Sequence, residues 1–205
     1  MAYYKTIEGR AIDEIVEKKS RFIGHIAHVE TEEEALAFLD EIRAQHRMAR
    51  HNVYAYVLRS GRIRYSDDGE PQKTAGMPTL EAIQHAGLVD VAVVVTRYFG
   101  GILLGTGGLV RAYTQATQAA IEASELVVVS RCVDIMFEVP YGLYEQVIRL
   151  AEACEAKVRE TDFAAEVMIT LRMLEGTQEP LITKLTELTR GQTELIISEP
   201  FDAPF

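Results

Sequence analysis

The chain has 205 residues, of which 48% are apolar, and its formal net charge is −10 at neutral pH. This length allows one large domain or two small ones with buried cores. No uncharged apolar run reaches the roughly 18 residues of a membrane helix, and the N-terminal residues do not resemble a signal peptide. We therefore expect a cytoplasmic protein without a membrane partner. The spacing of Cys132 and Cys154 fits no zinc or redox motif, and we predict no metal and no cofactor.

The negative charge is unevenly distributed along the chain. Residues 1–125 hold 14 basic and 17 acidic residues, whereas residues 126–205 hold 7 basic and 14 acidic residues. The second part therefore carries −7 of the net charge of −10. Such an asymmetry indicates two domains, which we predict at residues 1–125 and 126–205.

The first part alternates strands and helices. Two strands are expected before residue 30, the second over residues 21–29, and a capping box of Thr31 and Glu34 then predicts a helix. Residues 52–59 and 62–65 predict a hairpin around Ser60 and Gly61. The continuous apolar run at residues 90–99 is typical of a strand buried on both faces, so we expect it at the centre of the first sheet.

The second part predicts a βαββαβ order. Strands are expected over residues 126–139, 157–162, 165–173 and 193–199, and helices over residues 141–154 and 177–189. Thr177 is the expected N-cap of the second helix, and Gly191 is expected just beyond its last turn. This order predicts a ferredoxin-like domain. Its apolar positions have core spacing, which indicates no chemistry there: Val147, Ile148, Leu181 and Leu185.

One segment of the first part is strongly basic. Six arginines lie between residues 43 and 64 with no acidic residue among them. Local positive charge is what phosphate binding requires, so this window is a candidate nucleic-acid surface, although arginines also decorate surfaces that bind nothing. The window supplies four candidate anion-binding residues: Arg47, Arg50, His51 and Arg64.

A glycine-rich stretch follows the expected central strand, between Arg97 and Arg111. Glycines before a helix expose N–H groups beside its positive end and can cradle an anion. The spacing matches neither a dinucleotide-binding fingerprint nor a Walker loop. The glycines could instead let the alanine-rich helix pack closely on the sheet. The candidate anion-binding residues of this stretch are the two arginines and the glycine loop: Arg97, Gly105, Thr106, Gly107, Gly108 and Arg111.

The stretch SDDGEPQKTAGMP at residues 66–78 places three carboxylates around one glycine. Its spacing fails the calcium-loop pattern, which leaves a magnesium ion held mostly by water or a tight turn. Asp-Gly is common turn chemistry, and Thr74 to Leu80 predicts a turn into a helix with Pro78 in its first turn. The sequence offers His51 as an acid/base partner without placing it near the carboxylates.

Three motifs resemble the YigZ/IMPACT family, also called uncharacterised protein family 29, in its bacterial two-domain form. They are KSRFIG at residues 19–24, SDDGEP with TAGMP at residues 66–78, and VVVTRYFGGILLGTGGLVRAY at residues 93–113. The resemblance spans the whole chain. It implies an α+β protein, with a first domain folded like domain two of ribosomal protein S five and a second, ferredoxin-like domain. The motif loop matches the family at Asp67, Asp68, Gly69, Glu70, Pro71, Thr74, Ala75, Gly76 and Pro78.

The resemblance also carries a departure. The family usually has a small residue and then glycine where this chain has Gln72 and Lys73. If that position requires a positive φ, Lys73 adopts it at a cost of about 1 kcal/mol. If the loop instead faces a ligand, Lys73 adds a positive charge to it.

Three functional hypotheses follow. The resemblance implies a regulator rather than an enzyme, because eukaryotic relatives restrain an initiation-factor kinase by competing for its ribosome-associated activator. The first hypothesis is therefore a cytosolic, non-enzymatic regulator that binds RNA, the ribosome or a translation-associated protein, with no DNA sequence specificity. The second is a magnesium-dependent enzyme acting on a phosphorylated small molecule. The third is a purely protein-binding module.

Overall fold

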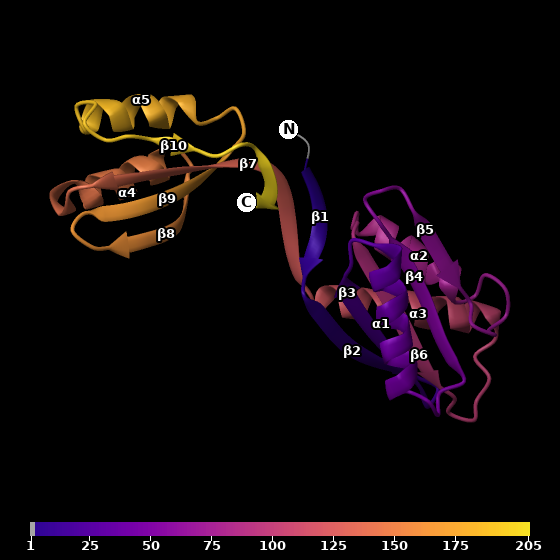
Figure 1. Ribbon diagram of the computed structural model, residues 1–205. Coiled ribbons are helices and arrows are strands. Elements are labelled where there is room, and N and C mark those ends of the chain that lie inside the picture. Colours follow the sequence, from indigo (N-terminus) through magenta and orange to yellow (C-terminus); the bar gives the residue numbers. More distant parts are fainter. Residues whose placement is uncertain (1–2) are drawn as a thin grey trace. The chain divides into compact units, whose positions relative to one another are not determined.

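The computed structural model describes residues 3–205 (Figure 1). Two compact units divide this range, residues 4–127 and residues 128–205, the latter together with Tyr3. Both units contain helices and strands, so the predicted two-domain α+β fold is confirmed. The domain limits at residues 125 and 126 stay a prediction. Among the described residues, no helix has the length and apolar character that a membrane-spanning segment needs.

The first unit is built around a five-stranded antiparallel sheet of order β2-β3-β6-β4-β5. The predicted central strand is confirmed as β6, and the predicted hairpin as β4 with β5. In β1, Lys5 forms a parallel bridge to Leu88 outside this sheet. The elements are β1 (Tyr3–Glu8), β2 (Arg10–Glu17), β3 (Ser20–His28), α1 (Glu32–Gln45), β4 (His51–Val57), β5 (Ile63–Ser66), α2 (Gly76–His85), β6 (Val91–Tyr98) and α3 (Thr106–Glu122).

Helices cover both faces of this sheet, which explains why β6 is apolar at successive positions. Val93 and Val95 pack in one core with side chains of α2 and α3, whereas Ala92 and Val94 pack in another core with α1. Figure 1 shows α1 on the near side of the sheet and α3 on the far side. A strand between two cores needs no polar alternation.

The capping of α1 differs in one detail from the prediction. The hydroxyl of Thr31 accepts a hydrogen bond from the N–H of Glu34, as expected for an N-cap. The Glu34 carboxylate, however, accepts from the N–H of Glu30 rather than from that of Thr31. The buried face of α1 comprises Ala35, Phe38, Leu39 and Ile42, whereas Leu36 is exposed.

A glycine in β3 allows α3 to lie against the sheet. A Cβ added to Gly24 would lie 2.4 Å from the carbonyl oxygen of Ala116 and 3.0 Å from Cβ of Ala120. The glycines at the start of α3 do not have this role. An added Cβ at Gly107 would meet only the end of the Arg111 side chain, at 3.7 Å, and one at Gly108 would meet Cβ of Leu104 just before the helix, at 3.0 Å. The close approach predicted for the alanine-rich helix is therefore made by Gly24 in the KSRFIG motif.

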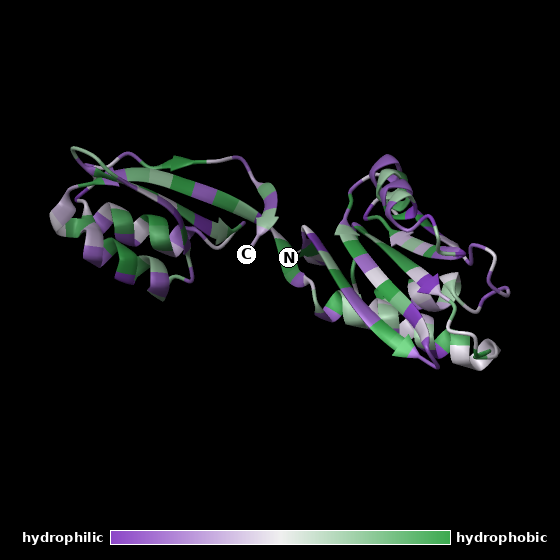
Figure 2. Ribbon diagram, turned by 90° about the horizontal axis from the view of Figure 1, so that it is seen from below, coloured by the Kyte–Doolittle hydropathy of each residue, from purple (hydrophilic) through white to green (hydrophobic). Residues whose placement is uncertain are grey.

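The second unit has the predicted ferredoxin-like order, with β10-β7-β9-β8 as neighbours and β11 also paired with β7. Its core lies between the helices and one face of the sheet, and Figure 2 shows both helices on the same side. Val147, Leu181 and Leu185 are buried as predicted. The elements are β7 (Glu125–Val139), the 3-10 helix η1 (Tyr141–Leu143), α4 (Tyr144–Ala153), β8 (Lys157–Phe163), β9 (Val167–Leu174), α5 (Glu179–Leu188), β10 (Ile196–Ile197) and β11 (Phe201–Pro204).

Two boundary predictions for this unit were wrong. The N-cap of α5 is Gln178, because the hydroxyl of Thr177 instead donates to the carbonyl of Leu174. Of the strand expected over residues 193–199, only Ile196–Ile197 forms, as β10, and β11 follows beyond the expected range. Beyond α5, the N–H of Gly191 donates to the carbonyl of Thr186 and that of Arg190 to Glu187, which is a Schellman ending.

We predict that Gly24→Ala lowers the free energy of unfolding by about 2–3 kcal/mol, because the new methyl group collides with backbone that has no space to move. Gly107→Ala is the matched control, and it should be neutral or stabilising by up to about 1 kcal/mol in a helix. Urea unfolding followed by circular dichroism measures both. Equal stabilities of the two variants would contradict the close packing of α3 at Gly24.

Candidate functional site

Most of the predicted site residues gather at one end of the five-stranded sheet. There β6 ends and β4 begins, so that Arg97 lies opposite His51 and Tyr98 lies opposite Arg21 on β3. The motif loop after β5 reaches the same end, because Nδ1 of His51 donates to the carbonyl of Asp68 at 2.8 Å. We call this region the β6 end.

The first carboxylate of the motif loop fixes the start of α2. Asp67 accepts hydrogen bonds from the N–H groups of Ala75 and Gly76 at 3.1 and 2.8 Å, and from that of Lys73 at 2.9 Å. The residue that begins α2 provides no side-chain cap of its own. Asp67 therefore satisfies N–H groups that a helix otherwise leaves unpaired.

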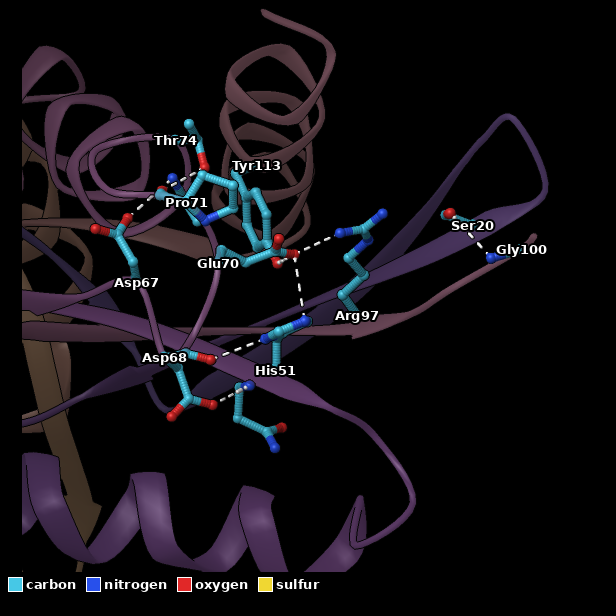
Figure 3. A network of polar contacts seen from close by, with 12 residues as sticks. Ser20, His51, Asp67, Asp68, Glu70, Pro71, Thr74, Arg97, Gly100 and Tyr113 are labelled. Atoms are coloured by element: carbon cyan, nitrogen blue, oxygen red, sulfur yellow. Dashed lines mark hydrogen bonds and ion pairs between the residues drawn. The ribbon is translucent and has the colours of Figure 1, made fainter. Parts of the chain in front are cut away.

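The second carboxylate ties the loop to β4 and α1. Asp68 accepts from the N–H of Asn52 at 2.7 Å, and its other oxygen lies 3.3 Å from Nη2 of Arg43. Asp68 itself has a φ of 45°, and Gly69 after it has a φ of 86°. These two left-handed residues turn the chain so that the next side chain, Glu70, points into the domain (Figure 3).

The third carboxylate forms a buried ion pair. Oε1 of Glu70 accepts from Nη1 of Arg97 at 2.6 Å and from the hydroxyl of Tyr113 on α3 at 2.8 Å (Figure 3). The side chains of Glu70 and Arg97 are only 4% and 9% exposed, and Nε2 of His51 lies 4.0 Å from Glu70. Burial, and then the nearby Glu70 carboxylate, raise the pKa of Tyr113 far above its ordinary value, so the hydroxyl stays a donor.

In this arrangement, all three acids of the motif stabilise the folded domain. Each carboxylate already accepts hydrogen bonds from the domain's own groups. Across residues 3–205, no group of three or more histidine, cysteine, aspartate or glutamate side chains is arranged to hold a metal ion. Glu70 also pairs with the charge of Arg97, whose buried Nε has no hydrogen-bond partner among the described residues, so anion binding by Arg97 stays a prediction.

The acid-free arginine window in the sequence is not acid-free in space. Arg64 lies on β5 opposite Tyr56, at the far end of the sheet, where Nη1 of Arg64 is 3.2 Å from Glu32. Arg62 pairs with the same carboxylate. The structure thus separates Arg64 from the other candidate residues, which sequence spacing alone did not reveal.

Five basic side chains around the β6 end form what we call the cationic rim. All are exposed, and within the described part of the chain none lies in an ion pair with an acidic side chain. Sequence analysis identified three of them and missed the two lysines of the β2–β3 turn, for which the only signal was that Lys19 begins the KSRFIG motif and Lys18 precedes it. The rim comprises Lys18, Lys19, Arg47, Arg50 and Arg111.

Specific contacts bring the segments of the rim to this end of the sheet. The N–H of Gly100 donates to the Ser20 hydroxyl at 3.0 Å, and a Cβ at Gly100 would lie 2.0 Å from the carbonyl carbon of Lys19. On the other side, Nδ1 of His46 lies 3.0 Å from the hydroxyl of Tyr98. The β2–β3 turn and the end of α1 therefore both flank the end of β6.

Large apolar side chains stand exposed at the same end, and we call them the apolar tip. Met48 is 87% exposed and Leu103 is 83% exposed. Beyond them, Gly105 has a φ of 72° and starts α3, which has no side-chain cap and leaves its first N–H groups available. An exposed apolar group rimmed by charge marks an interaction surface. The tip comprises Met48, Phe99, Ile102 and Leu103.

Beneath this end, His25 is buried in β3, and its Nε2 has no hydrogen-bond partner among the described residues. The ring centre of His25 lies 5.1 Å from that of His46. Burial, and then the neighbouring His46, lower the pKa of His25 to about 4. His25 is therefore neutral at physiological pH.

Comparison with known proteins covers both units. The Impact N-terminal domain matches residues 18–121, and a domain of unknown function (DUF1949) matches residues 137–192. A protein of Haemophilus influenzae named IMPACT family member is 37% identical over 203 residues, which is 97% of this chain and 98% of that protein. A Saccharomyces cerevisiae protein named Protein IMPACT homolog is 31% identical over 121 residues, or 55% of this chain and 46% of that protein.

A solved structure also resembles this chain over the residues of both units. The crystal structure of a hypothetical protein has a TM-score of 0.62 at 32% identity, covering 97% of this chain and 98% of that one. The likeness thus extends to the whole chain in both sequence and structure.

The turn at Lys73 generates a stability prediction. Lys73 has a φ of 61°, a conformation that costs a non-glycine residue about 1 kcal/mol or more. Lys73→Gly should raise the free energy of unfolding by about 0.5–1 kcal/mol in urea titrations, the gain being reduced by the greater freedom of glycine in the unfolded chain. Lys73→Ala, which removes the charge and keeps the strain, is the control and should bring no gain. A larger gain from alanine would contradict the assignment to backbone strain.

The buried histidine generates a pH prediction. Because the pKa of His25 is about 4 in the folded state and about 6.5 when unfolded, the unfolded chain binds more protons between these values. Stability should therefore fall as the pH decreases from about 6.5 to about 4. Between pH 7 and pH 5, the wild type should lose about 2 kcal/mol more than His25→Leu in urea unfolding. Parallel pH profiles of the two proteins would refute this.

Proposed function

Because the chain belongs to the IMPACT family, we propose that it is a cytosolic, non-enzymatic regulator that binds RNA or a ribosomal surface through its first domain. The family resemblance of the sequence motifs suggests the link to translation, and the β6 end suggests how the partner is bound. The cationic rim and the start of α3 are the surface to which we assign the partner.

The observation that carries this proposal is the unpaired charge of the rim. Arg47 and Arg50 lie between α1 and β4, and Arg111 lies on α3. None of the three is neutralised by an acid of the described chain, whereas Arg97 and Arg64 both are. The three acids of the motif loop are engaged by backbone N–H groups or by Arg97, and Glu17 at the β2–β3 turn stands next to two lysines of the rim. The β6 end is therefore positive within a protein of net charge −10, as phosphate binding requires.

The enzymatic alternative loses its main support. It required Asp67, Asp68 or Glu70 to hold magnesium, but Asp67 caps α2, Asp68 binds the N–H of Asn52, and Glu70 is buried against Arg97. Releasing any of these carboxylates for a ligand would leave buried or helix-end donors unpaired, at a cost of about 1–3 kcal/mol each.

A second candidate function is binding of an acidic segment of a translation-associated protein. The apolar tip favours it, because Met48, Ile102 and Leu103 are aliphatic and cannot stack on bases as an aromatic ring does. An amphipathic acidic helix would place its apolar side on the tip and its carboxylates on the rim. Phe99 serves either partner, since an aromatic ring can stack on a base or pack against a helix.

We predict that Arg47→Glu/Arg50→Glu weakens co-sedimentation with ribosomes or RNA at least tenfold and flattens its dependence on salt, because two phosphate contacts are lost. Arg149→Glu/Arg159→Glu is the matched control, since it makes the same charge change at exposed positions of the second unit. The control should bind like the wild type. Unchanged binding by the Arg47/Arg50 variant would contradict the proposed surface.

The same assay separates the two candidate partners. If the partner is RNA, Phe99→Leu should weaken binding severalfold by removing an aromatic stacking surface, while Leu103→Ser should have little effect. If the partner is a protein segment, Leu103→Ser should be the more damaging change.

A further inference from the structure

The second unit presents an interaction surface of its own, opposite in charge to the cationic rim. We propose that the helix-free face of its sheet binds a basic, amphipathic segment of a protein partner, with lysine or arginine on one side and apolar residues on the other. This proposal does not rest on the function proposed for the first domain.

Strand register defines the surface. Residues directly opposite each other on neighbouring strands point to the same face. Met168 on β9 lies opposite Glu138 on β7 and Asp162 on β8, and Met136 on β7 lies opposite Ile196 on β10. The alternate residues of β7 and β9 form the core beneath the helices, so this set faces the other way.

A shallow groove of about 390 Å³ crosses this face. Its floor is apolar, since Met136, Met168 and Ile196 are all exposed there. Methionine side chains adapt their shape to different apolar partners, which suits a surface that receives side chains rather than a fixed small molecule. Six of its lining residues are either apolar or acidic, three of each: Met136, Met168 and Ile196, and Glu138, Glu166 and Glu194.

The carboxylates of the groove have no counter-charge. Among residues 3–205, no lysine, arginine or histidine forms an ion pair with Glu138, Glu166 or Glu194, whereas the neighbouring Asp134 is paired with Arg172 at 2.8 Å. Residues 126–205 carry a net charge of −7, which reinforces the local field. This face repels phosphates and attracts cations.

The spacing of the three glutamates indicates which kind of cation the groove can bind. No metal-holding cluster of carboxylates occurs in the described part of the chain, so these acids do not converge on one ion. They lie instead around an apolar floor, and this pattern is complementary to several basic side chains flanking an apolar stripe. The occupant that matches both the charge and the apolar floor is therefore a basic amphipathic protein segment.

The test uses the full chain and a fluorescein-labelled synthetic peptide of lysine and leucine, with the leucines spaced to form one face of a helix. Fluorescence anisotropy at several salt concentrations measures binding. Glu138→Lys/Glu194→Lys should weaken binding at least tenfold, because two attractive charges become repulsive. The control, Glu152→Lys/Glu187→Lys, makes the same charge change at exposed positions of α4 and α5 and should bind within about twofold of the wild type.

Two further variants separate this face from general charge attraction. Met136→Ser/Met168→Ser should weaken binding severalfold without changing the salt dependence, since only the apolar contact is lost. Arg47→Glu/Arg50→Glu should bind the peptide like the wild type, so a failure of the first-domain proposal leaves this one standing.

Several results would overturn the inference. Equal losses in the groove variant and in the control would show attraction to net charge alone. Binding of a peptide with glutamate in place of lysine would show apolar attraction without charge selection. Shifts of backbone amide resonances on α4 and α5, rather than on β7 and β9, would show that the peptide binds elsewhere. Binding of RNA to this face would show that its partner is a nucleic acid and not a protein segment.

Discussion

The buried ion pair of Glu70 and Arg97 holds the first domain's binding end together. Arg97 stands at the end of β6, Glu70 lies in the loop between β5 and α2, and Tyr113 joins them from α3. Removing one partner of such a pair leaves a buried charge alone, at a cost of about 3–5 kcal/mol. The pair therefore fixes the motif loop against the sheet and the glycine-rich helix, and the two long sequence motifs become one structural unit.

This interaction also changes what the motifs mean. Arg97 beside a glycine-rich loop suggests phosphate binding, and three carboxylates around Gly69 suggest a metal site. In the fold these opposite charges satisfy one another, and the groups left for a partner are the flanking ones. The binding surface that we propose is thus formed by Lys18, Arg50 and the side chains around them, while the motif residues position the segments that carry it.

Sequence patterns predicted the features that depend on residues close together in the chain. The capping residue Thr31, the apolar run that becomes β6 and the order of elements in the second unit follow from periodicity and turn chemistry, which neighbouring residues determine. The site depended on pairing between distant segments. Arg64 and Arg50 have similar surroundings in the sequence, yet Glu32 neutralises only Arg64, because α1 begins at the opposite end of the sheet from the one where it ends. Lys18 and Lys19 lie at the β6 end because the next residue, Ser20, accepts a hydrogen bond from the N–H of Gly100, 80 residues further along the chain.

The two proposed surfaces would also divide the chain's charge between two kinds of recognition. A protein of net charge −10 would be repelled by RNA if its charges were mixed, since like-charge repulsion acts over roughly 10 Å at 0.1 M salt. Unpaired cations at the β6 end and unpaired acids around Met136 and Met168 would give each proposed surface its own preference. The apolar side chains at both places add contact area that charge alone does not provide, so each surface can distinguish a folded or amphipathic partner from a simple counter-ion.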